Sequence, residues 1–194
     1  QTLREGRTLA RLRHPNLPRI RQLVSHKNDI YLVADEIAGR TVAQAVEEDG
    51  AFDPELVRRY LKQLLQVVDF LHSQPQPIIH RDLRPTSILV TQHGNLRLAE
   101  FGLAKMGEAA AGRAATSFRS AGDPDFAAPE QLLGDTSSVK NDIYSVGALA
   151  YYMALGKPPA ASLKRFAGGT IMAPMPAETD PKVVEVVKLC LEPK

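Results

Sequence analysis

Apolar residues recur at helical spacing in three stretches of the chain. In residues 1–13 they alternate with charged side chains, and His14-Pro15 ends the stretch. The other two begin at Asp53-Pro54 and Asp180-Pro181. An aspartate accepts hydrogen bonds from the free N–H groups of a first helical turn, and proline fits that turn. We therefore predict helices over residues 1–13, from Asp53 to about residue 72, and from Asp180 onward.

A fourth stretch, residues 139–155, is apolar almost throughout and predicts a buried helix. It is shorter than the roughly 20 residues that span a bilayer. Apolar residues in 17–24 and 29–35 flank a turn-rich link and predict two antiparallel strands. Residues 88–90 and 96–98, joined through His93-Gly94-Asn95, predict a β-hairpin.

A polar segment at residues 80–87 leads directly into this hairpin. It lies between two short apolar segments, so we expect a rigid polar loop held between two buried strands. Glu100 follows the second hairpin strand, which predicts that Asp82 and Glu100 lie at one rim of the hairpin. Loops on rigid scaffolds often carry binding and catalytic residues.

These two segments resemble two motifs of protein kinases. His80-Arg81-Asp82 resembles the start of the catalytic loop, and residues 100–102 resemble the metal-binding Asp-Phe-Gly motif. Further family motifs follow the expected order at residues 14–16, 128–130 and 142–147. The resemblance implies an α+β, protein kinase-like fold with a mainly helical large lobe and a partial small lobe.

The resemblance also divides the chain. Residues 1–34 are expected to form a partial small lobe, 35–40 the hinge, and 41–194 a large lobe that is incomplete at its C-terminus. The sequence is most similar to bacterial serine/threonine kinases in residues 14–18 and in Gln131. No Gly-rich loop or strand lysine precedes the first helix, although these parts hold the ATP phosphates in the family. We favour a fragment over a shortened small lobe.

Composition narrows the possible partners. The 24 Lys and Arg residues nearly balance the 22 Asp and Glu residues, and only 6% of residues are aromatic, which argues against nucleic-acid binding. A single cysteine, Cys190, excludes an internal disulfide and favours a reducing, cytoplasmic location. We expect no leader peptide and no membrane contact from this segment. A protein substrate or protein partner is expected.

The resemblance implies a site for ATP and magnesium. Glu5 would pair with the missing lysine. Ala34 would be the gatekeeper, and the backbone groups of Asp35 and Ile37 would face the adenine. Leu89 is assigned to the same nucleotide-binding site.

Four charged or polar positions carry the implied chemistry. Asp82 would orient the attacking hydroxyl of phosphoryl transfer, and Arg84 stands where serine/threonine kinases have a phosphate-binding lysine. Ser87 and Glu100 occupy the metal-ligand positions, where the family has asparagine and aspartate. Serine is a poorer magnesium ligand, and the extra methylene of Glu100 disturbs a site that requires octahedral geometry at about 2.1 Å. We expect weakened or absent magnesium binding.

Asp123 is a further departure from the family pattern. Serine/threonine kinases usually have threonine at this position, bonded to the catalytic aspartate. A second carboxylate near Asp82 would raise the pKa of one of the two.

Residues 106–120 are rich in small and polar residues and occupy the place of the activation segment. Thr116, Ser117 and Ser120 are candidate phosphorylation sites, and Arg81 is the candidate clamp for the phosphate. A flexible linker with incidental hydroxyl groups is an equally good interpretation.

The packing motifs of the family are retained. His80 is expected to be a packed core histidine, and Phe101, Gly102, Glu130 and Asp142 match structural positions. Asp142 is expected to bond to the backbone of the catalytic loop, because a buried carboxylate needs partners. Retained packing with altered chemistry predicts a pseudokinase with a regulatory or scaffolding role. The alternatives are an active but atypical serine/threonine kinase and a nucleotide-sensing scaffold.

Overall fold

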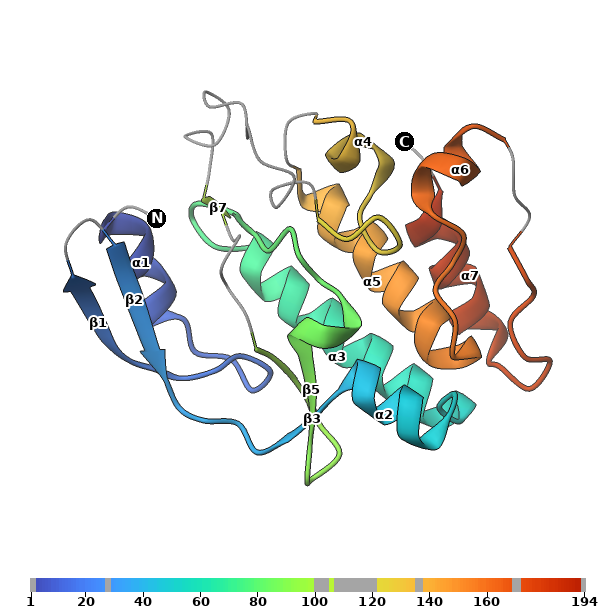
Figure 1. Ribbon diagram of the computed structural model, residues 1–194, viewed down its shortest axis with the longest axis horizontal. Helices are drawn as coiled ribbons and strands as arrows, with labels where there is room; N and C mark the ends of the chain where they lie inside the picture. The colour runs from blue at the N-terminus through green and yellow to red at the C-terminus, as the bar shows by residue number, and fades with distance from the viewer. Residues whose placement is uncertain are drawn as a thin grey trace.

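The N-terminal part of the chain forms a helix and a two-stranded sheet. A computed structural model describes residues 3–26, 29–99, 105–106, 122–134, 138–168 and 172–192. Helix α1 (Leu3–Arg11) packs against the antiparallel strands β1 (Ile20–His26) and β2 (Asp29–Ala34) (Figure 1). The helix and both strands were predicted.

The prediction that the first strand begins at Leu17 was wrong. The Leu17 N–H donates to the His14 carbonyl at 3.1 Å, so the chain turns here, and the Leu17 side chain is buried in the core. Pro18 has no N–H to donate to a strand partner. β1 therefore starts at Ile20, after this turn.

A three-stranded antiparallel sheet carries the predicted hairpin. Its order is β3 (Gly39–Thr41), β5 (Ile88–Thr91), β6 (Leu96–Leu98). Gly94 adopts the left-handed conformation (φ 68°) that the hairpin turn requires. A third, two-stranded sheet pairs β4 (Ile78–Ile79) with β7 (Lys105–Met106).

Three long helices form the centre of the large lobe. These are α3 (Pro54–His72), α5 (Val139–Leu155) and α7 (Pro181–Leu191). α5 packs against α3 on one side and α7 on the other (Figure 1). The Asp53 carboxylate accepts from the Leu56 N–H at 2.9 Å, and the Asp180 carboxylate accepts from the Lys182 N–H at 2.9 Å. The predicted helix starts are confirmed.

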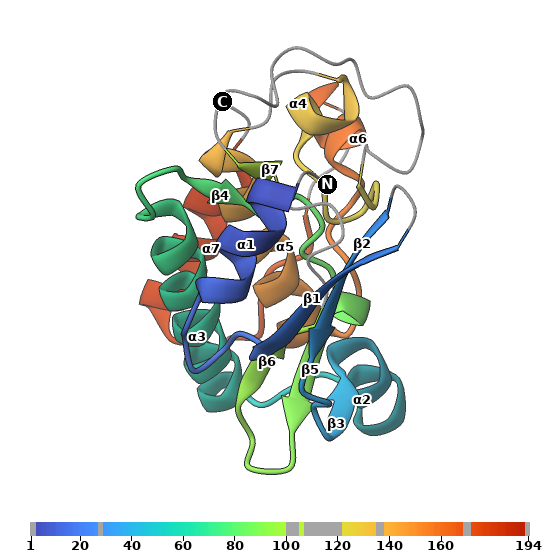
Figure 2. The same ribbon diagram turned by 90° about the vertical axis from the view of Figure 1, so that its left-hand side faces the viewer.

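Four shorter helical elements were not predicted. They are α2 (Val42–Asp49), the 3₁₀ turn η1 (Pro85–Ser87), α4 (Pro129–Leu132) and α6 (Ser162–Phe166). α2 contacts η1, β3 and β5, while α4 contacts α6. Figure 2 shows α1, β1 and β2 in front of the long helices, with the hairpin below them. The α+β, kinase-like fold class is confirmed.

The core lies mainly between α3 and α5. Leu64 and Leu71 of α3 are fully buried, as are Leu149 and Met153 of α5. The buried residues of α3 lie on one face of the helix, whereas those of α5 lie on all sides. Both distributions agree with the sequence pattern. Among the residues that the structure describes, no helix is both long and apolar enough to span a bilayer.

The segment between α1 and β1 is bonded to the large lobe. The Asn16 carboxamide donates to the Gln63 side chain of α3 at 2.9 Å and to the Leu96 carbonyl of β6 at 2.7 Å. The Asn16 carbonyl accepts from the Leu98 N–H at 2.9 Å, and Arg97 donates to the Leu17 carbonyl at 3.0 Å. These contacts connect the segment between α1 and β1 to α3 and β6.

His14 in this segment should make the stability of the protein pH-dependent. Burial lowers the pKa of its imidazole below 6.5, and its Nδ1 accepts the Asn16 N–H at 3.1 Å, which requires an unprotonated Nδ1. In the unfolded chain the imidazole takes up a proton more readily, so the free energy of unfolding falls as the pH drops below about 6.5. Urea unfolding of His14→Gln should show a smaller loss of stability than the parent between about pH 7.5 and about pH 5.5. Equal losses would contradict this role.

Candidate functional site

One buried carboxylate accepts hydrogen bonds from the backbone of the loop between β4 and β5. Asp142, in the first turn of α5, is 0% exposed. It accepts from the backbone N–H groups of His80 and Arg81, each at 2.8 Å, and lies 2.9 Å from His72 Nε2. The contact of Asp142 with the loop backbone is therefore present as expected. His80 is itself buried, in agreement with a packing role.

Arg81 is held in an unusual conformation. Its φ is 71°, in the left-handed region that non-glycine residues rarely adopt. Its N–H bonds to Asp142, and its carbonyl accepts from the Gln131 side chain at 2.7 Å. The hydrogen bonds to the N–H and to the carbonyl of Arg81 thus maintain its strained backbone. Burial lowers the pKa of the Arg81 guanidinium, while the charge of Asp142 raises it.

Gln131 was not assigned a role by sequence reasoning. It is buried in α4 and reaches the Arg81 carbonyl across 50 positions of the chain. Gly122 makes this contact possible, because a Cβ at that position would lie 2.7 Å from Gln131 Nε2. The sequence signal was a glutamine directly after Ala128-Pro129-Glu130, but its partner is found only in the folded chain.

The predicted base and the predicted phosphate contact lie side by side. Arg84 Nε is 3.3 Å from Asp82 Oδ2, and the Asp82 side chain is 15% exposed. The Asp82 N–H faces His80 Nδ1 at 3.4 Å. The carboxylate is thus reachable from solvent, and an arginine neutralises part of its charge.

Ser87 is fully buried in the 3₁₀ turn of the same loop. Its hydroxyl accepts from the Arg84 N–H at 3.1 Å. The carbonyl oxygens of Asp82 and Arg84 each lie 2.9 Å from the hydroxyl and are the acceptors for its proton. A hydroxyl used in this way closes the loop on itself and does not suit a magnesium ion. Among the described residues there is also no cluster of three His, Cys, Asp or Glu side chains suited to a metal.

Several predicted site residues lie outside the described residues: Glu100, Phe101, Gly102, Thr116, Ser117 and Ser120. Glu5 belongs to α1, but its side chain is also outside the description. Asp123 uses its carboxylate locally, accepting from the Asp125 N–H at 3.0 Å. Glu130 accepts from the Asn141 carboxamide at 3.3 Å. The coupling of Asp123 to Asp82 stays a prediction.

The predicted nucleotide-binding residues lie at the end of β2 and on β5. Ala34 is the last residue of β2, and the next N–H, that of Asp35, donates to the Arg19 carbonyl at 3.0 Å. The Asp35 carboxylate pairs with Arg21, and the hydrogen bond from Arg21 lowers the pKa of the Asp35 carboxyl group. Leu89 is paired with residues of β3 and β6. The Asp35 N–H is thus already bonded to the chain before β1, and the adenine contact of its backbone stays a prediction.

A helical lobe, a bonded catalytic loop and a β-hairpin after it define a kinase-type domain. The chain belongs to the protein kinase domain family, whose sequence profile matches residues 1–191. It is similar to mitogen-activated protein kinase kinase kinase 3 of Arabidopsis thaliana, with 33% identity over 96% of this chain and 29% of the relative.

Two further relatives are serine/threonine or calmodulin-dependent kinases by name. CBL-interacting serine/threonine-protein kinase 16 of Arabidopsis thaliana is 32% identical over 82% of this chain and 35% of the relative. Calcium/calmodulin-dependent protein kinase type 1 of Macrobrachium nipponense is 30% identical over 80% of this chain and 44% of the relative. The chain spans less than half the length of these relatives.

Proposed function

We propose that this kinase domain is a pseudokinase, a regulatory or scaffolding module with impaired phosphoryl transfer. The observation that carries the proposal is Ser87, at the position where the family has a metal-binding asparagine. It is fully buried, and its hydroxyl is used by the backbone of its own loop. The domain therefore lacks a suitable magnesium ligand at this position.

The residues that remain support only part of the chemistry. Asp82 is partly exposed and can orient a hydroxyl group by accepting its hydrogen bond. Arg84 lies 3.3 Å from that carboxylate, so its charge is shared with Asp82 instead of serving a phosphate alone. Glu100 and Asp123 add two further departures from the family pattern. Protein kinases depend on metal ions to neutralise the charge that develops during phosphoryl transfer.

A genuine but slow serine/threonine kinase is the second candidate. It is favoured by the intact support of the catalytic loop, where Asp142 and Gln131 hold both sides of Arg81. In that case Asp82 serves as the base toward the hydroxyl of a protein substrate. A nucleotide-sensing scaffold is the third candidate and requires ATP binding without transfer.

We further infer a bacterial-type kinase domain that acts in the cytoplasm on a protein partner. The bacterial assignment is supported by residues 14–18 and by Gln131, and the location by the single cysteine. Arg81 is the proposed clamp for a phosphate on Thr116, Ser117 or Ser120.

Restoring the family residues in the full-length protein tests the pseudokinase proposal. The triple variant Ser87→Asn, Glu100→Asp, Asp123→Thr should transfer phosphate to a generic protein substrate at least about tenfold faster than a silent parent, equivalent to about 1.4 kcal/mol of barrier. Asp82→Ala in both backgrounds is the control, and it should abolish the gain. A parent that is already active and loses its activity on Asp82→Ala would refute the proposal.

Thermal unfolding with ATP separates the three candidates. A ligand that binds only the folded state stabilises it by about 2.7 kcal/mol at a hundredfold excess over its dissociation constant. A magnesium-dependent shift favours the slow kinase, and a shift without magnesium favours the nucleotide-sensing scaffold. No shift is expected for a scaffold that binds protein alone.

A further inference from the structure

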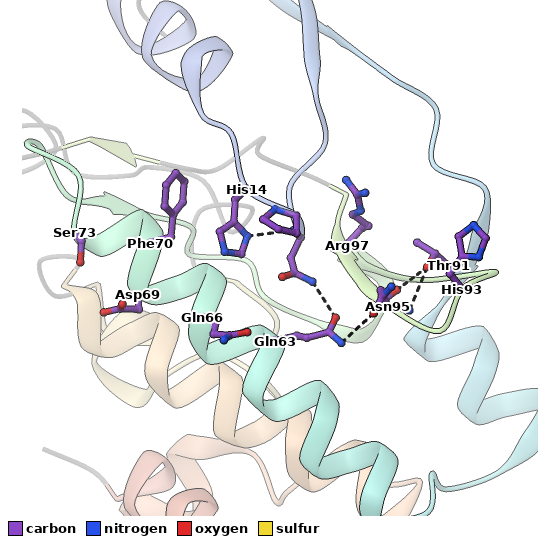
Figure 3. A pocket seen from close by; sticks show the side chains of 12 residues that line it. His14, Gln63, Gln66, Asp69, Phe70, Ser73, Thr91, His93, Asn95 and Arg97 are labelled. Atoms are coloured by element: carbon purple, nitrogen blue, oxygen red, sulfur yellow. Dashed lines mark hydrogen bonds between the residues drawn. The ribbon is translucent and has the colours of Figure 1, made fainter.

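A large cavity lies where the α1–β1 segment meets α3 and the hairpin. Its volume is about 820 Å³, and Figure 3 shows its side chains. None of its lining residues belongs to the catalytic loop at residues 80–87. We call it the rear groove. It is lined by His14, Pro15, Asn16, Gln63, Gln66, Asp69, Phe70, Ser73, Thr91, His93, Asn95 and Arg97.

The two ends of the rear groove carry opposite charge. Asp69 of α3 is exposed and has no hydrogen-bond or ion-pair partner for its carboxylate among the described residues. Figure 3 shows it beside Phe70 and Ser73, at the end away from Arg97 and His93. Nη1 of Arg97 donates to the Leu17 carbonyl at 3.0 Å, and the Arg97 side chain lines the groove. The rear groove therefore has a negative charge at one end and a positive charge at the other.

The geometry sets the spacing of a complementary ligand. Asp69 and Gln63 are six positions apart on α3, which corresponds to about 9 Å at about 1.5 Å per residue. Gln63 Nε2 is 3.4 Å from Asn95 Oδ1, at the hairpin end of the groove. Three residues of a polyproline II segment advance about 9 Å and return a side chain to the same face. Side chains three positions apart on such a segment therefore have the same spacing as Asp69 and Gln63 along α3.

The floor of the groove suits a basic side chain at the Asp69 end. Phe70 packs against the His14 ring, with centroids 5.0 Å apart. A lysine or arginine stem packs on such an aromatic surface while its charge reaches a carboxylate. The His14 Nδ1 accepts a hydrogen bond from Asn16, and the ring does not repel a cation while it stays neutral. Gln66 and Asn95 offer carboxamides to a peptide backbone.

We propose that the rear groove binds an extended segment of a partner protein. This segment carries a basic side chain for Asp69 and an acidic side chain for Arg97, three positions apart. Because His14 and Asn16 precede the small-lobe strands, a bound segment contacts both lobes. Arg97 also lines the neighbouring cavity that contains the hinge residues Asp35 to Ala38, so the partner is placed next to the hinge. The proposal holds with or without phosphoryl transfer.

Fluorescence anisotropy with labelled peptides tests this assignment on the full chain. The probes carry Lys-Pro-Pro-Glu or Glu-Pro-Pro-Lys at their centre, and matched probes have Gln in place of either charged residue. We expect the chain to bind one of the two peptide orientations. Asp69→Asn and Arg97→Gln should each weaken the affinity for that peptide about threefold to fivefold, as for partly exposed ion pairs. Glu178→Gln and Lys140→Gln, exposed charges outside the groove, should leave binding unchanged.

A charge-swapped variant makes the test sharper. Asp69→Lys combined with Arg97→Glu should reverse the preference between the two peptide orientations. If neither peptide binds at about 1 mM, the proposal is overturned. A dissociation constant of about 1 mM corresponds to a binding free energy of about 4 kcal/mol. Binding that the control variants weaken as much as Asp69→Asn would also overturn the proposal. So would a dimer in sedimentation experiments that dissociates on Asp69→Asn, because the occupant would then be a second copy of the chain.

Discussion

Replacing Asp142 by alanine should lower the free energy of unfolding by about 3–5 kcal/mol. The carboxylate is 0% exposed and holds two backbone N–H groups of the catalytic loop at 2.8 Å, with His72 Nε2 at 2.9 Å. Alanine leaves these groups buried without an acceptor, and each unsatisfied group costs about 1–3 kcal/mol. Arg81 would also lose one of the bonds that hold its left-handed backbone.

Urea unfolding at neutral pH measures this loss. Asp142→Asn keeps one acceptor oxygen and should lie between the parent and Asp142→Ala. Ser145→Ala is the matched control on the same helix, because Ser145 is also buried but its hydroxyl bonds only to the Asn141 carbonyl one turn away. We expect that control to lose less than about 1 kcal/mol. A similar small loss for Asp142→Ala would show that Asp142 does not anchor the loop.

Replacing Gly147 by alanine should destabilise the packing of α5 on α7. A Cβ at this position would lie 2.5 Å from Cys190 Cβ and 3.2 Å from Leu191 Cγ. Such overpacking costs up to about 3 kcal/mol, while the better helix propensity of alanine returns about 1 kcal/mol. The net loss is therefore about 2 kcal/mol in the free energy of unfolding.

A double-mutant cycle isolates the clash. Cys190→Gly removes the opposing Cβ, although glycine is a slightly poorer helix former than cysteine and weakens α7 a little. If the two Cβ atoms clash, the double variant should be more stable than the sum of the single effects by at least about 1 kcal/mol. Additive effects would place the cost of Gly147→Ala elsewhere.

The long helices could be predicted because their signals are local. Asp53 and Asp180 cap their own helices, and the apolar faces of α3 and α7 repeat at the helical period. The hairpin was predicted for the same reason, since Gly94 provides the turn within the segment itself. The shorter helices α2, α4 and α6 were missed. Short helices are marginal in isolation, so packing against the rest of the fold decides whether they form.

The site was predicted less completely than the fold. The resemblance to kinases implied the bond from Asp142 to the catalytic loop, which the structure contains. It did not indicate that Arg84 lies against Asp82 or that Gln131 holds the Arg81 carbonyl. It also left open how Ser87 uses its hydroxyl, which is bonded inside the loop. These contacts depend on side-chain positions that no spacing of residues encodes.

The sequence by itself determined the kinase class, the helix starts, the hairpin and the positions at which the chemistry departs from the family. Each of these follows from residues that are neighbours in the chain or from motifs in a fixed order. Only the tertiary structure decided the rear groove, where Asp69 and Arg97 come from α3 and β6 and His14 from the segment before β1. Such contacts join residues tens of positions apart without any period in the sequence, so packing alone brings their charges to opposite ends of one groove.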